Sequence, residues 1–84
     1  MDETYITIEY LREILAKCGS TTPGPWVSFI EGRDHDSGSS FIRTAGNDIE
    51  LSGATDADQD FMANAKQDIP ALVAEIVRLK GWSL

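Results

Sequence analysis

The sequence predicts one α+β domain: an N-terminal helix, a three-stranded antiparallel meander, and a C-terminal kinked helix or helix pair packed on one face of the sheet. Near both ends of the chain, apolar residues recur at spacings of three and four, the period of an amphipathic helix. The middle of the chain instead holds three short β-prone runs separated by turn residues. With 84 residues the chain has room for one hydrophobic core, so we expect a single domain over residues 1–84.

The first helix is expected over residues 6–18. Its apolar positions are Ile6, Tyr10, Leu11, Ile14, Leu15 and Cys18. Thr4 or Thr7 suits the N-cap, and Gly19 suits the end of the helix. Residues 20–25 contain two prolines, which lack an amide donor and disfavour helix, so we expect a rigid connector there.

Two β-prone runs follow, at residues 26–31 and 39–44. The residues between them, 34–38, read Asp-His-Asp-Ser-Gly, which is a composition typical of turns. The two runs are therefore expected to pair as a hairpin.

A third strand is expected over residues 48–52, after a Gly-Asn turn signal. Successive side chains on a strand point to opposite faces of the sheet. We therefore expect Ile49 and Leu51 to face the helices. Asp48 and Glu50 then face water.

The last helical pattern begins at Thr55, which with Asp58 three residues later resembles a capping box. Its apolar positions are Phe61, Met62, Ala65, Leu72, Val73, Ile76 and Leu79. Pro70 interrupts this pattern, because proline suits the first turn of a new helix and bends a continuing one. The sequence thus predicts either two short helices or one kinked helix, ending at Gly81.

The chain is acidic, with fourteen Asp and Glu against seven Lys and Arg and a formal charge of −7. This balance argues against nucleic acid as a partner, since sequence-independent binding needs cations to replace counterions, and it disfavours anionic membranes. Between residues 46 and 65 the acids meet no basic residue; they are Asp48, Glu50, Asp56, Asp58 and Asp60. Such a segment could steer a protein with a basic surface, or could serve only to keep the chain soluble.

These five acids, together with Trp82, form the predicted binding set. Trp82 follows the expected helix end by one residue, where it can either complete the core or anchor a partner. Three of the acids also have a local role, because negative charge stabilises the N-terminus of a helix.

Candidates for catalysis are few. His35 is the single histidine and lies between Asp34 and Asp36, so a small hydrolase or metal enzyme centred there is one hypothesis. The same residues suit a hairpin loop, which is the interpretation we favour. Cys18 falls on the apolar side of the first helix and is expected in the core.

The spacing of acids at positions 56, 58 and 60 resembles the start of a calcium loop. Phe61 stands where that loop needs glycine, and Gln67 where it needs a bidentate glutamate. We therefore predict no catalytic residues, no metal site and no cofactor, and a chain that is not an enzyme.

Met1 is followed by Asp2 and Glu3 rather than by a basic and then an apolar segment, and no run reaches membrane-spanning length. A single cysteine, Cys18, fits a reducing compartment. The expected location is the cytoplasm.

Residues 21–26, Thr-Thr-Pro-Gly-Pro-Trp, and the helical segment 58–76 together resemble the frame of small phage and mobile-element proteins of the Ead/Ea22-like kind. The resemblance covers about half the chain. It implies an accessory protein of phage or bacterial mobile DNA without an established enzymatic activity.

Two functional hypotheses remain. The first is an inhibitor, such as an immunity protein for a basic toxin or a counter-defence protein, with the acidic segment as its contact face. The alternative is a homo-oligomerising structural module, in which the last helix forms a homodimer through an apolar edge. That edge would comprise Leu72, Val73, Ile76, Val77 and Trp82.

Overall fold

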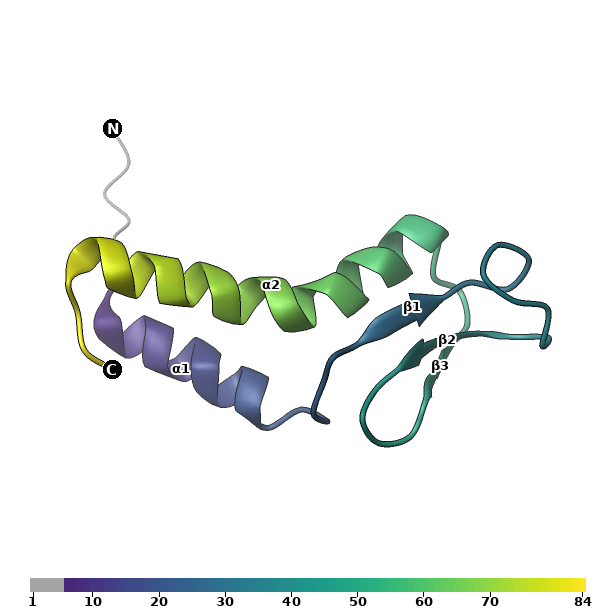
Figure 1. Cartoon of the computed structure of the whole chain (residues 1–84), viewed down its shortest axis with the longest axis horizontal. Helices are drawn as coiled ribbons and strands as arrows, with labels where there is room; N and C mark the ends of the chain where they lie inside the picture. The colour runs from purple at the N-terminus through teal and green to yellow at the C-terminus, as the bar shows by residue number, and fades with distance from the viewer. Residues whose placement is uncertain (1–5) are drawn as a thin grey trace.

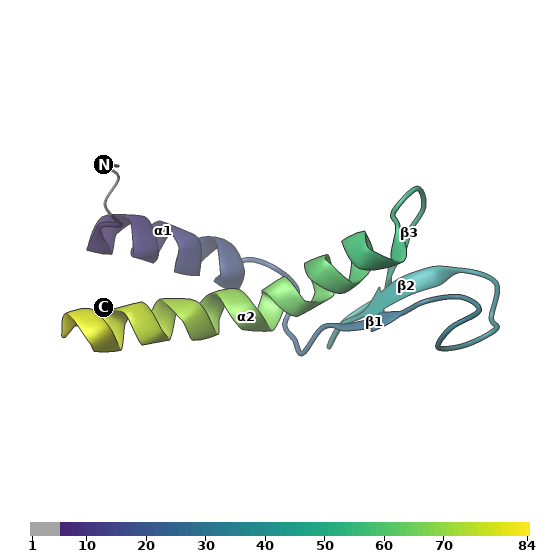
Figure 2. The same ribbon diagram turned by 90° about the horizontal axis from the view of Figure 1, so that it is seen from above.

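The computed structural model describes residues 6–84, and the order of its elements confirms the predicted α+β layout. The elements are α1 (Ile8–Gly19), β1 (Val27–Phe29), β2 (Ser40–Arg43), β3 (Ile49–Leu51) and α2 (Asp56–Lys80). Figure 1 shows α2 running along one long side of the molecule, with α1 beside its C-terminal half and the sheet beside its N-terminal half. Only α2 among the helices lies over the sheet, because α1 lies against α2 further along the molecule (Figure 2).

The molecule is elongated and thin. It measures 46 × 32 × 17 Å and has a radius of gyration of 15.9 Å. A compact domain of this length has a radius of gyration of about 12 Å. The two packing units therefore lie side by side along α2 instead of enclosing one round core.

Helix α1 starts where the sequence predicts a cap. The Thr7 side chain accepts a hydrogen bond from the amide of Tyr10 at 3.1 Å, while the other candidate cap, Thr4, lies outside the described residues. The helix ends at Gly19, and the following amide of Ser20 bonds back to the last carbonyl groups. Leu11 is its fully buried residue and faces α2.

The three strands form an antiparallel meander in the order β1-β2-β3. They are shorter than the predicted runs, because polar side chains take the backbone groups at their ends. The amide of Ile30 donates to the Asp34 carboxylate at 2.8 Å, and the amide of Trp26 donates to Gln67 on α2 at 2.7 Å.

The pleat divides the sheet as predicted. Ser28, Ile42 and Ile49 are paired across the strands and share one face, and Ser28 bonds to Gln59 of α2, so this face meets the helix. Ile42 is buried, whereas Glu50 and Asp48 are exposed.

The opposite face of the sheet carries two aromatic rings. Phe29 and Phe41 are register partners and stack with their centroids 5.2 Å apart. The Arg43 guanidinium lies 4.7 Å from the Phe29 ring centre. This face is therefore covered by an arginine side chain rather than by a second helix.

Helix α2 is one continuous helix of 25 residues with Pro70 inside it. Of the two predicted forms, the single bent helix is the one observed, and Figure 1 shows the ribbon changing direction in its middle. Proline removes one helical hydrogen bond and crowds the preceding turn, which accounts for a bend. The predicted capping box is confirmed, since Thr55 and Asp58 each bond to the other's amide. Gly81 ends the helix with a φ of 69°, a left-handed conformation that glycine adopts without strain.

The hydrophobic core is small. Its buried apolar residues are Leu11, Ile30, Ile42, Ala63 and Val73. A core of this size leaves much apolar surface of α2 uncovered, and that surface is the feature with most functional interest.

Candidate functional site

The buried and half-buried residues of α2 identify the side of the helix that faces the rest of the molecule. Every third or fourth residue is buried or half-buried, at Gln59, Ala63, Lys66, Pro70, Val73 and Val77. These positions follow the 3.6-residue period of one helix face. They are the contact side of α2 toward the sheet and α1.

A second row of apolar residues runs beside that contact side. We call this row the outer stripe. It comprises Met62, Ala65, Ile69, Leu72, Ile76 and Leu79, together with Phe61, which directly precedes Met62. From Met62 onward its spacings are three, four, three, four and three, which keeps all six on one line along the helix. Three members are largely in water: Phe61 is 74% exposed, Leu72 63% and Leu79 68%.

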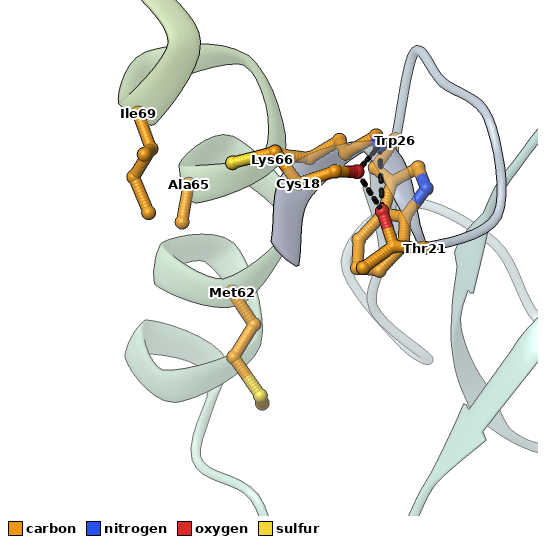
Figure 3. A pocket seen from close by; sticks show the side chains of 7 residues that line it. All are labelled: Cys18, Thr21, Trp26, Met62, Ala65, Lys66 and Ile69. Carbon is orange, nitrogen blue, oxygen red and sulfur yellow. Dashed lines mark hydrogen bonds between the residues drawn. The ribbon is translucent and has the colours of Figure 1, made fainter. Parts of the chain in front are cut away.

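The outer stripe borders a groove between α2 and the end of α1. The groove has a volume of about 170 Å³ and is lined by Cys18, Thr21, Trp26, Met62, Ala65, Lys66 and Ile69. Figure 3 shows Met62, Ala65 and Ile69 following one another along α2, with Thr21 and Trp26 across from them. Cys18 lies in this wall and is half-buried, so the prediction that it belongs to the core is wrong.

The far wall of the groove is fastened to α2 by Lys66. Its ammonium donates to the Cys18 carbonyl at 3.0 Å and to the Thr21 hydroxyl at 2.6 Å (Figure 3). It also lies 5.7 Å from the Trp26 ring centre. Lys66 is thus one of several contacts that hold the connector, together with Gln67, which bonds to Trp26, and the Ala45 amide, which donates to the Pro23 carbonyl at 2.9 Å.

A second hollow lies on the other side of the outer stripe. It has a volume of about 380 Å³ and is lined by Phe61, Asn64, Ala65, Asp68, Ile69 and Leu72. Ala65 and Ile69 line both hollows. The small Ala65 side chain therefore sits in a depression between larger apolar neighbours, and the apolar surface continues from one hollow to the other.

The five acids of the predicted binding set fall at the sheet end of the molecule, where β3 leads into α2 (Figure 1). Asp48, Glu50 and Asp56 are exposed and form no ion pair with any residue from 6 to 84. The Ser39 hydroxyl donates weakly to Glu50 at 3.3 Å.

The other two acids are engaged inside the fold. Asp58 belongs to the capping box, and Asp60 forms a two-pronged ion pair with Arg33 at 2.9 and 3.0 Å. Hydrogen bonds from Arg33 hold the pKa of the Asp60 carboxyl below its usual range, with a further contribution from Ser28. Asp34 accepts from the same guanidinium, and its pKa is lowered first by Arg33 and then by the Ile30 amide.

Trp82 is not brought together with the acids. It follows the C-terminal end of α2, at the opposite end of the molecule from the sheet (Figure 1). Its amide donates to the Val77 carbonyl at 3.0 Å, and the Lys80 ammonium lies 5.8 Å from its ring centre. Trp82 is half-buried and packs beside Lys80 at the C-terminal end of α2.

His35 is held by its own loop. Its Nδ1 accepts from the Ser37 amide at 3.0 Å and lies 2.7 Å from the Ser37 hydroxyl, and its ring packs 5.0 Å from the Phe41 ring. Its Nε2 is buried without a hydrogen-bond partner among the described residues. His35 lines neither of the two hollows described above.

Among residues 6–84, no three His, Cys, Asp or Glu side chains gather closely enough to hold a metal ion. Asp56, Asp58 and Asp60 themselves lie in the first turn and a half of α2, so helical geometry places their side chains around the axis.

Two features of this surface differ from the sequence prediction. The predicted apolar edge of the last helix is only partly right, because Leu72 is exposed but Val73 is 4% exposed and Val77 and Trp82 are half-buried. The uncovered residues are instead Phe61, Leu72 and Leu79. The spacing of apolar residues in the sequence could have indicated this uncovered face. The row from Met62 to Leu79 runs beside the row from Gln59 to Val77, and the two rows together span more of the helix surface than one contact face can cover. Gln59 was the second omission, because nothing in a local pattern marks a glutamine as buried.

No helix in the described part of the chain is long and apolar enough to cross a membrane. No family model, curated protein or solved structure matches this chain. The Ead/Ea22-like resemblance stays a prediction.

Proposed function

We propose that this chain is a protein-binding module without a catalytic role, and that the outer stripe of α2 is its contact surface. The observation that carries the proposal is the row formed by Phe61, Leu72 and Leu79, each more than three-fifths exposed on one helix. Monomeric proteins rarely leave so many large apolar side chains in line unless the surface meets a partner.

The outer stripe presents on the order of 500 Å² of apolar surface. This is as large as the largest patch on a typical monomer, about 300–600 Å², and a patch of that rank is often functional. Covering it gains about 10 kcal/mol before the cost of association, itself about 4–15 kcal/mol. A partner that adds apolar area of its own therefore binds with a net gain.

Hollows on both sides of the stripe favour side chains that enter from a partner. Ala65 lies at the floor shared by the two hollows, where large side chains of a second helix can fit beside Ile69. Knobs that enter such depressions are the usual packing between helices.

The proposal is tested by affinity capture with three baits: the wild type, Leu72→Glu and Ala71→Glu. Ala71 is exposed and adjacent to Leu72 but lies outside the outer stripe, so it controls for the added charge. Proteins held by the wild type and by Ala71→Glu, and lost by Leu72→Glu, are the expected result. Equal capture by all three baits would contradict the proposal.

A second candidate is an inhibitor that presents its acidic end to a basic protein, as an immunity or counter-defence protein of a phage or mobile element would. The observation that favours it is the exposure of Asp48 and Asp56, which have no cationic partner within residues 6–84. Charge reversal by Asp48→Lys with Asp56→Lys should then release the partner, and binding should weaken as salt rises. Capture that survives both changes would count against this candidate.

A further inference from the structure

We propose that the occupant of the outer stripe is a second copy of this chain, related by a two-fold axis, with the two α2 helices antiparallel. This inference rests on the proposed function and names the partner of the same surface. It draws on the symmetry of the stripe, on the charge along α2, and on the uncovered side of the helix.

The outer stripe is symmetric about the middle of α2. Phe61 and Leu79 lie nine residues to either side of Pro70, and the spacings from Met62 to Leu79 read the same in both directions. An antiparallel copy with its axis near Pro70 therefore places Phe61 of one chain against the partner's Leu79, and the reverse. Self-complementarity of this kind is what a two-fold homodimer requires.

The charge along α2 favours this direction. From Asp56 to Asp68 the helix carries four acids and one lysine, a net charge of −3, and from Ile69 to Lys80 it carries one acid and two bases, a net charge of +1. A parallel pair would align two acidic halves. An antiparallel pair places each acidic half beside the partner's basic end, and it also opposes the two helix dipoles.

The space for a second copy is present. In Figure 1, α1 and the sheet both lie on the same side of α2, and within residues 6–84 no other element covers the opposite side. Figure 2 looks down on α2 from that uncovered side, with α1 to one side of the helix and strands β1 and β2 to the other. Contact from Phe61 to Leu79 extends over roughly 27 Å of helix. With about 500 Å² from each chain, the pair buries on the order of 1,000 Å², which reaches the threshold for a biological interface and corresponds to a weak, reversible dimer.

The oligomeric state tests the inference directly. Sedimentation or light scattering over about 1–500 μM should show the 84-residue wild type reaching twice its 9.2 kDa mass. The dimer should persist or strengthen at higher salt, because each chain carries a net charge of −7. A wild type that stays monomeric throughout this range overturns the inference.

Variants locate the interface. Leu72→Glu and Leu79→Glu should each weaken dimerisation at least tenfold, whereas Ala71→Glu should leave it within about twofold. All three positions are exposed, so the helical circular dichroism should be unchanged. A dimer that resists both stripe variants contradicts this inference and the proposed function together, while a monomer that still captures another protein through Leu72 contradicts this inference alone.

The relative direction of the two α2 helices in the dimer is tested by the distance between spin labels attached to Ala57→Cys in a Cys18→Ser background. Ala57 lies thirteen residues from Pro70, so antiparallel helices separate the two labels by roughly 40 Å along the axis, against roughly 10 Å for parallel helices. The long distance is the expected result. The short one would overturn the antiparallel assignment.

Discussion

Gln59 of α2 donates a hydrogen bond from its Nε2 to the carbonyl of Phe41 on β2 at 2.9 Å, and its side chain is only 1% exposed. The same nitrogen lies 3.2 Å from the Phe29 carbonyl and 3.1 Å from the Ser28 hydroxyl. One amide thus joins the helix to two strands. In a core this small, that polar contact fixes where α2 crosses the sheet.

Replacement of Gln59 by leucine should destabilise the fold although it adds an apolar side chain. The leucine fills much of the space but leaves the strand carbonyls without their donor, and an unpaired buried polar group costs about 1–3 kcal/mol. The measurement is the free energy of unfolding from urea titration followed by circular dichroism.

Ala71→Leu is the control for this prediction. Ala71 lies on the same helix, is exposed and lies outside the outer stripe, so its replacement should change the free energy of unfolding by less than about 0.5 kcal/mol. If both variants behave alike, the contacts of Gln59 contribute no specific stability.

Removal of the Thr55 hydroxyl should loosen the start of α2. Thr55→Ala loses the bond from the Asp58 amide at 3.0 Å, and N-cap losses of this kind cost about 1 kcal/mol. Hydrogen exchange should show faster exchange of the Asp58 amide, with little change at the α1 end of the helix. Thr55→Ser, which keeps the hydroxyl, should retain most of the stability and the slow exchange.

The ion pair between Arg33 and Asp60 should make stability depend on pH in the acid range. The folded-state pKa of Asp60 and that of Asp34 lie below the ordinary value of 3.8, since both carboxylates accept hydrogen bonds from Arg33. A lowered folded-state pKa stabilises the fold above 3.8, and this contribution is lost as the pH falls through the folded-state value.

The comparison of wild type with Arg33→Gln isolates that contribution, because all other carboxylates titrate in both proteins. The difference in melting temperature should be constant above about pH 5 and should shrink as the pH falls below 3.8. A difference that stays constant down to pH 2 would show that Arg33 does not stabilise the folded carboxylates.

Local sequence signals predicted the elements of this fold well. The alternation in Ile49, Glu50 and Leu51 sets the two sides of β3. The capping box between Thr55 and Asp58 marks the start of α2. Both signals act between residues close in the chain. Geometry then leaves little choice about where the side chains point.

The division of α2 into covered and uncovered faces could not be predicted in the same way. Whether Leu72 or Val73 enters the core depends on where α1 and the sheet lie around the helix, and those positions are set by distant contacts such as the one between Lys66 and Cys18. A chain of 84 residues also has too little other structure to cover every apolar face of a 25-residue helix.

The predicted binding set was divided for a related reason. Acids that are neighbours in sequence have different roles, because Asp60 meets Arg33 from a loop 27 residues away while Asp56 meets water. Trp82 lies near the far end of α2, where only the length of an unbroken helix could place it. Because of Pro70, the sequence was compatible with two short helices as well as with one long helix, so the position of Trp82 could not be predicted.

The contact between Trp26 and Gln67 gives a last prediction, on the connector that forms one wall of the groove. The Gln67 side chain accepts from the Trp26 amide at 2.7 Å and donates to its carbonyl at 3.3 Å, so it pairs with the connector as a neighbouring strand would. Gln67→Leu removes both bonds and should cost about 1 kcal/mol. In a Trp82→Phe background, where Trp26 is the single tryptophan, its fluorescence should shift to longer wavelength as the ring becomes more exposed to water. Gln67→Glu keeps the acceptor and should keep most of the native spectrum, and an unchanged spectrum in Gln67→Leu would mean that Lys66 alone holds the connector to α2.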